Sequence, residues 1–290
     1  MHSTPDKWFC FPPIQASLVE GYSPDSPILI SERIRIDKVP AWAVSDETLE
    51  ILGEEDRSAL RSENFCLCSD YEAEALGSPD PTWKGEEPRS IQDSITEEIA
   101  IFPLCLWIEK PTGLISKLIG HVRRENRWSI LRERVKYDSM LVTKEQALQT
   151  MTLANLDIAI KLHKEMLLLD RRGTVWTATR LLFRALSTRE WNIRFLLHAV
   201  CLESLFGADT EITFRLSTRI AKFLCPNSKE SKKLFRKCKN LYGWRSKIVH
   251  GMRLQKLKPE QSGLLMEEIE QIVREVFKKV LLENYVSTFD

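Results

Sequence analysis

An arginine and a histidine five residues apart form the clearest chemical pattern in this sequence. Arg245 and His250 lie in the segment Leu241-Tyr-Gly-Trp-Arg-Ser-Lys-Ile-Val-His-Gly251. Cleavage of RNA by its own 2′-hydroxyl needs a group that titrates near neutrality to move a proton, which histidine supplies, and a fixed cation to hold the phosphate, which arginine supplies. This route requires no metal ion. We therefore expect Arg245 and His250 to act on a phosphodiester.

A run of cations precedes this pair. Between Lys229 and Lys247 the chain has eight basic residues and a single acid, Glu230. Such runs are commonly solvated helix faces, but Phe235, Tyr242 and Trp244 lie within this one and offer surfaces on which bases can stack. If the segment binds no RNA, the run is a solvated face. The predicted RNA contacts are Lys232, Lys233, Arg236, Lys237, Lys239, Tyr242 and Lys247.

Helical geometry limits what the pair can do within one chain. At about 100° per residue, positions five apart on an α-helix point roughly 140° apart, so one regular helix does not aim both side chains at one atom. Two interpretations remain. Either the helix is distorted near Gly243, or two copies of the chain complete one groove. Gly251 is a typical residue to follow a helix C-terminus, which places His250 in the last turn, where the helix dipole favours a protonated ring.

Other active-site patterns are absent from the sequence. It has no glycine-rich phosphate loop, no nucleophile elbow and no His-Glu-x-x-His zinc motif. Cys66-Leu-Cys68 lacks the spacing and the second ligand pair of a zinc site, and His163-Lys-Glu165 lacks the cysteine pair of zinc deaminases. We expect neither a metal nor a cofactor.

The segment around Arg245 resembles the signature of HEPN domains, an arginine followed by a histidine after four to six residues, in the form typical of the Apea-like group. Tyr242, the block from Arg245 to Gly251 and the preceding stretches 194–207 and 210–221 carry the resemblance, which covers about 174–285. It implies an α-helical domain that often dimerises. In many members this domain is a metal-independent endoribonuclease that serves as a toxin or antiviral-defence effector.

Carried over by position, Arg245 and His250 are the catalytic pair, and Ser246 occupies the supporting polar position after the arginine. Trp244 departs from the smaller or aliphatic residue expected there. The implied partners are RNA, a second copy of the chain through the C-terminal helical domain, and a regulatory or antitoxin protein. Because some members bind without cutting, a non-catalytic RNA- or protein-binding module is the alternative.

Glu203 is a further candidate for the site. Its helical neighbours Leu196, Ala199 and Phe206 are apolar, and a buried carboxylate without a cation is costly. We therefore expect Glu203 to form a structural ion pair with an arginine, Arg245 in the first place, rather than to transfer a proton. His198, on the same stripe, is expected to be a core histidine.

The residues after Thr143 have the apolar periodicity of helices. We expect helices at 143–170, 175–186, 187–207, 210–224, 229–249 and 260–285, with capping boxes at Thr143 and Ser187. No strand signal follows Thr143. Residues 143–290 are therefore predicted to form an all-α bundle, and the resemblance implies that this bundle is HEPN-like.

Residues 1–142 contain more residues that break regular structure. They predict strands at 28–36 and within 128–142, helices at 45–61 and 91–101, and a loop at 77–89. This half is expected to be an irregular α+β domain whose role the sequence does not indicate. The whole chain is thus predicted to be α+β, mostly α, with domains at 1–142 and 143–290.

Charge and composition restrict the class of protein. The net charge of +1 conceals a charge of −9 on residues 1–142 and +10 on residues 143–290, which suits an anionic partner for the second half. A further interpretation is that the acidic half masks the basic half. No stretch has the ~18–20 apolar residues of a membrane helix, and the cysteines number seven. The first residues lack a basic start followed by an apolar run, so we do not expect them to be a signal peptide. We expect a cytoplasmic protein with reduced thiols and no membrane partner.

Overall fold

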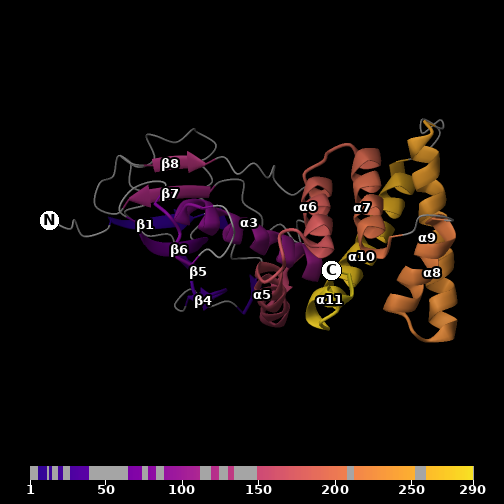
Figure 1. Ribbon diagram of the computed structural model, residues 1–290, viewed down its shortest axis with the longest axis horizontal. Coiled ribbons are helices and arrows are strands. Elements are labelled where there is room, and N and C mark those ends of the chain that lie inside the picture. Colours follow the sequence, from indigo (N-terminus) through magenta and orange to yellow (C-terminus); the bar gives the residue numbers. More distant parts are fainter. Residues whose placement is uncertain are drawn as a thin grey trace. The chain divides into compact units, whose positions relative to one another are not determined.

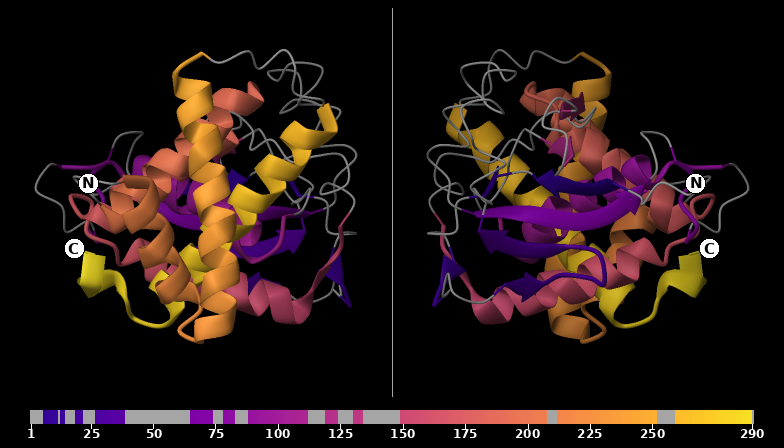
Figure 2. Two further views of the ribbon diagram at one scale, coloured as in Figure 1. Left: turned by 90° about the vertical axis from the view of Figure 1, so that its right-hand side faces the viewer. Right: turned by 90° about the vertical axis from the view of Figure 1, so that its left-hand side faces the viewer.

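The chain is mostly α-helical with a small β-sheet, an α+β fold as predicted (Figures 1 and 2). It divides into two compact units, Met1–Lys164 and Glu165–Asp290. The division falls inside a helix, whereas charge and periodicity change at Thr143 in the sequence. The computed structural model describes residues 6–11, 13–14, 19–21, 27–38, 65–73, 78–82, 88–111, 119–123, 130–133, 149–207, 212–251 and 259–289.

The first unit contains an antiparallel sheet in the order β4-β5-β6-β1-β7-β8, with β2 also paired to β6. The central strand β6 is buried on both faces of the sheet. Its consecutive residues 66–69 are all buried, and successive side chains of a strand point to opposite faces. The strands are β1 (Asp6–Phe11), β2 (Pro13–Ile14), β4 (Ile28–Leu29), β5 (Arg35–Lys38), β6 (Phe65–Ala73), β7 (Ile119–Arg123) and β8 (Ile130–Glu133).

The strand predicted at 28–36 is instead a short hairpin. β4 and β5 pair in antiparallel orientation, and a turn at 30–34 joins them. The Ser31 hydroxyl accepts hydrogen bonds from the backbone amides of Arg33 and Ile34, both at 3.1 Å. A serine that bonds to nearby amides favours a turn over a continuous strand, which explains the error.

Helix α3 (Ile91–Glu109) lies in the core of the first unit and contacts β6. From Ile99 to Ile108 it is apolar on every side, as expected of a helix that is covered all round. The predicted helix at 91–101 is confirmed and continues through Pro103 to Glu109. His163 of α5 (Leu153–Leu167) places Nε2 2.9 Å from the carbonyl oxygen of Glu98, and burial lowers the pKa of His163 to about 4.

Two predictions near residue 143 were wrong. The predicted helix starts only at Leu153, because β9 (Met151–Thr152) precedes it and pairs in parallel with β3 (Val19–Glu20). A strand therefore does follow Thr143. Two residues are too few to show an alternating pattern, so periodicity could not reveal it. The predicted helix at 45–61 and the capping box at Thr143 lie outside the described residues.

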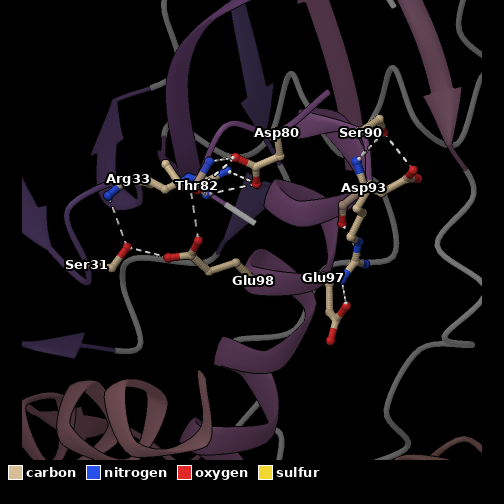
Figure 3. A network of polar contacts seen from close by, with 9 residues as sticks. Ser31, Arg33, Asp80, Thr82, Ser90, Asp93, Glu97 and Glu98 are labelled. Carbon is tan, nitrogen blue, oxygen red and sulfur yellow. Dashed lines mark hydrogen bonds and ion pairs between the residues drawn. The ribbon is translucent and has the colours of Figure 1, made fainter. Parts of the chain in front are cut away.

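A partly buried polar network fastens the β4–β5 turn to α3 (Figure 3). The two terminal nitrogens of Arg33 donate to Oδ2 of Asp80 at 3.2 and 3.3 Å, and Nη1 also donates to the Thr82 hydroxyl at 2.9 Å. The Ser31 hydroxyl donates to Glu98 at 2.5 Å. Burial raises the pKa of Glu98. Burial alone would also raise the pKa of Asp80, but polar contacts from Ser94 and Thr82 and the charge of Arg33 hold it below its ordinary value.

Replacing Asp80 with Asn should lower the free energy of unfolding by about 1–3 kcal/mol at neutral pH, because a buried ionic hydrogen bond is lost. The pKa of Asp80 is lowered in the folded chain. Its ionised carboxylate therefore contributes stability above the unfolded pKa, and this contribution disappears as the pH falls through the lowered folded value. The difference between wild type and variant in urea unfolding should shrink in acid.

Asp70→Asn is the matched control for this measurement. Asp70 also pairs with an arginine, Arg35, at 2.8 Å, but its side chain is 63% exposed. Its loss should cost less than about 1 kcal/mol. Equal losses in the two variants would show that burial of the Asp80 network contributes nothing.

The second unit is all-α throughout its described residues, as predicted for this part of the chain. Helix α7 contacts four others: α6, α8, α9 and α10. The expected helices are confirmed, with ends that differ by a few residues. They are α6 (Thr174–Leu186), α7 (Trp191–Phe206), α8 (Ile212–Leu224), α9 (Ser228–Val249), α10 (Pro259–Leu282) and the short α11 (Val286–Phe289).

The capping box predicted at Ser187 was wrong. Helix α7 begins at Trp191, and its N-cap Glu190 makes no side-chain capping bond. The hydroxyls of Ser187 and Thr188 instead donate to the carbonyl oxygens of Phe183 and Arg184, at 2.9 and 2.7 Å. They therefore satisfy carbonyls at the end of the preceding helix, a role for which hydroxyl residues are equally suited.

Within the described residues, no helix combines the length and the apolar character that crossing a membrane demands. The same part of the chain contains no group of three or more His, Cys, Asp and Glu side chains arranged to hold a metal ion. The free thiols in this part of the chain include Cys66, Cys68, Cys105, Cys201, Cys225 and Cys238.

Candidate nucleic-acid interface

Helix α9 carries the predicted site and has well-defined ends. The Asn227 side chain caps its first turn by accepting a hydrogen bond from the amide of Lys229 at 3.2 Å. The helix continues through Gly243 without a break to Val249, and His250 is its C-cap. Gly251 follows with φ of +63°, a conformation that favours glycine. The predicted helix end is confirmed, and a distortion at Gly243 is not observed.

One face of α9 is buried against the other helices of the unit. Cys238, Leu241, Tyr242 and Ile248 are all at most 7% exposed. The Tyr242 hydroxyl donates to the carbonyl oxygen of Ala199 in α7 at 3.3 Å, and burial raises the pKa of Tyr242 well above its ordinary value. The prediction that Tyr242 stacks on RNA was therefore wrong, because its ring packs in the core.

The opposite side of α9 carries a set of exposed cations, which we call the cationic face. α9 contacts α8 and lies beside it (Figure 1). On a helix of about 100° per residue, these positions fall within one half of the circumference. Five of the seven predicted RNA contacts belong to this face. Its members are Lys229, Lys232, Lys233, Arg236, Lys239 and Lys247, all exposed.

The remaining predicted lysine differs from this set. Lys237 is half-buried, and its ammonium lies 3.9 Å from a carboxylate oxygen of Glu268 in α10. At the other end of the face, Lys247 holds its ammonium 4.1 Å from the centre of the Trp244 ring. Trp244 is half-buried, so part of this indole reaches the surface.

Arg245 forms the ion pair that was predicted for it. Its Nη2 donates to Oε2 of Glu203 at 3.2 Å, and its Nε lies 3.1 Å from Oε1. The arginine side chain is 31% exposed and the glutamate side chain 20%. The pair connects α9 to α7 on the same side of α9 as the buried Tyr242. Glu203 thus positions Arg245, and its carboxylate is occupied by that contact.

His250 lies on the other side of the helix from Arg245. It is exposed and borders the cationic face, and its ring makes no hydrogen bond or ion pair with any residue that the structure describes. Ser246, four residues earlier, is also exposed, and its carbonyl oxygen accepts the His250 amide at 3.1 Å. Within one chain, His250 and Ser246 therefore share a surface, and Arg245 does not belong to it.

A buried ionic cluster between α7 and α10 was not predicted. Arg194 Nη2 lies 2.6 Å from Oε1 of Glu270, and Nε2 of His198 lies 3.6 Å from the same oxygen. His198 is fully buried, as expected of a core histidine, and burial lowers its pKa. Burial alone would raise the pKa of Glu270, but His198 and Arg194 hold it below its usual value. In the sequence, Glu270 follows Glu267 and Glu268, and such a run of acids usually indicates a solvated helix face. The sequence therefore did not indicate that Glu270 forms a buried ion pair.

Comparison with protein-family models, with curated proteins and with solved structures found no match. Function is therefore inferred from the residues and their arrangement.

A double-mutant cycle on Glu203→Gln and Arg245→Gln should give a coupling energy of about 0.5–1.5 kcal/mol in chemical unfolding, because the pair is partly shielded from solvent. Tyr242→Phe on the same face of α9 should cost about 1 kcal/mol through the lost hydrogen bond. A coupling energy near zero would show that Glu203 does not position Arg245.

Proposed function

We propose that this chain is a metal-independent endoribonuclease of the HEPN type, which serves as a toxin or antiviral-defence effector. One observation carries the proposal: an exposed histidine ends the same helix surface that presents six exposed cations. Lysine and arginine side chains bind phosphate groups. An imidazole beside them is suited to proton transfer at neutral pH.

In the proposed reaction the cationic face holds the RNA backbone and His250 moves the proton. The 2′-hydroxyl gives its proton to water, its oxygen forms a bond to phosphorus, and the bond from phosphorus to the 5′-oxygen breaks. The protonated imidazole of His250 donates a proton to the departing 5′-oxygen and is then reprotonated from water. The products are a 2′,3′-cyclic phosphate and a free 5′-hydroxyl. Exposed cations beside the phosphate stabilise the charge that develops on its oxygens.

The position of Arg245 supports association of two copies in this reaction. Arg245 and His250 point roughly 140° apart on a regular helix, so one chain does not aim both at one phosphate. We propose that two copies associate through the helical unit, so that Arg245 of one copy and His250 of the other face the same RNA. Glu203 would hold Arg245 in the orientation that such a shared cleft needs.

The wild type should cut single-stranded RNA in the presence of EDTA, and His250→Ala should lower the rate by about 10²- to 10⁴-fold, as is usual for loss of a general acid or base. Val249→Ala is the matched control, because Val249 is adjacent, 51% exposed and without chemical function. It should cut like the wild type. No cleavage by the wild type, or equal cleavage by His250→Ala, would refute the proposal.

A non-catalytic RNA-binding module is the second candidate. The ion pair between Arg245 and Glu203 favours it, because an arginine held by a carboxylate has less charge to offer a phosphate. In this case the cationic face binds RNA and His250 is a surface residue. Both candidates share the binding surface and differ only in the outcome of binding.

Binding through the cationic face should depend steeply on salt. For single-stranded RNA, the slope of log K against log salt should fall by about 0.7 for each phosphate contact removed. The double variant Lys232→Ala/Lys239→Ala should therefore bind more weakly and with a shallower slope, measured by fluorescence anisotropy. If the slope is unchanged, RNA binds elsewhere. If His250→Ala binds like the wild type and the wild type never cuts, the second candidate is correct.

A further inference from the structure

Gly243 is a glycine in the interior of α9 that nothing in the described structure requires. Its φ is not positive, and a Cβ added there would meet no atom within 4 Å. Neither backbone conformation nor internal packing therefore accounts for it. Glycine in place of alanine inside a helix lowers the folding equilibrium by about two- to fivefold. Close approach of another molecule to the backbone is one of the uses of glycine, and the open space at Gly243 permits it.

Gly243 also lies at the centre of the proposed site. Counting from it along α9, Arg236 and Lys239 are seven and four residues before, and Lys247 and His250 are four and seven residues after. This spacing places all five on one line along the helix. Apart from Gly243, which is half-exposed, each member is exposed. This line of residues thus begins with the cations Arg236 and Lys239 and ends with Lys247 and the imidazole of His250. Between them, at Gly243, the helix backbone has no side chain.

Trp244 provides a stacking surface next to this bare backbone. In the absence of a ligand, its ring is covered by the ammonium of Lys247 at 4.1 Å. A cation over an indole at the surface favours the contact by about two- to fivefold. A nucleobase stacked on an aromatic side chain favours binding by about five- to hundredfold. Replacing the Lys247 ammonium on the Trp244 ring by a nucleobase is therefore favourable. It also frees Lys247 to bind a phosphate.

We propose that Gly243 and Trp244 form the base-binding part of the RNA site. An unpaired nucleobase lies against the helix backbone at Gly243 and stacks on Trp244, and the flanking cations hold the phosphates on either side. The inference rests on the proposed function, because it names the contact that places the strand beside His250. Charge favours RNA over a second copy as the occupant, since two cationic faces in direct contact would repel each other.

The proposal separates stability from binding at one residue. Gly243→Ala and Gly243→Gln both favour the helix and enter open space, so the melting temperature should rise by about 2 °C. Affinity for a fluorescent single-stranded RNA of mixed sequence should nevertheless fall, by about threefold for Ala and about tenfold or more for Gln. Trp244→Leu should weaken binding similarly, and Trp244→Phe should restore most of it. The affinity for the same RNA as a duplex should change little in these variants, because paired bases are not free to stack on Trp244.

Gly263→Ala and Gly263→Gln on α10 are the matched controls, because a Cβ at Gly263 also meets nothing within 4 Å. They should raise stability and leave RNA binding unchanged. If the wild type cuts RNA and His250→Ala does not, but both Gly243 variants bind and cut like the wild type, the proposed function stands and this inference is wrong. If Gly243→Gln weakens self-association in sedimentation while RNA affinity is unchanged, the glycine contacts a second copy and the inference is also wrong. Absence of RNA binding by the wild type overturns both proposals.

Discussion

The rotation of α9 about its own axis determines what the surface of the helical unit can do. Cys238, Leu241, Tyr242 and Ile248 bury one face of the helix. Burial of each large apolar side chain is worth about 1.5–3 kcal/mol, more than the 0–1 kcal/mol of a typical surface ion pair. Packing rather than charge therefore sets the rotation. Each residue rotates the direction in which its side chain leaves the helix by about 100°. Once the buried face is fixed, the directions of all the remaining side chains on α9 are therefore fixed as well.

This constraint separates the two residues that first suggested chemistry. Arg245 belongs to the packed side and is paired with Glu203, whereas His250 belongs to the exposed side and borders the cationic face. Within one chain, the exposed side is an imidazole among basic side chains, and in the proposed function these groups bind phosphates and move a proton. In that proposal Arg245 takes part only from a second copy. The same rotation leaves Gly243 on the exposed side of α9, where we propose that a nucleobase approaches the backbone.

Much of the helical unit could be predicted because amphipathic helices leave a clear periodic pattern. The ion pair of Glu203 was also predictable, since its apolar neighbours require a cation. The burial of Tyr242 could have been predicted from the helical spacing that it shares with Cys238 and Leu241. It was missed because Tyr242 lies within a run of basic residues. Contacts between residues far apart in sequence were not accessible. The approach of Arg33 to Asp80 and the burial of Glu270 depend on how distant elements pack, and no local pattern records that.

The central claim is that bound RNA lies beside His250. Nuclear magnetic resonance of the histidine Cε1–Hε1 groups during titration with single-stranded RNA tests it most directly, because the buried His163 and His198 are internal controls in the same sample. The His250 signal should shift with saturation as RNA is added, while the signals of His163 and His198 stay in place. A His250 signal that does not move while RNA binds, or shifts of equal size at the buried histidines, would contradict the claim.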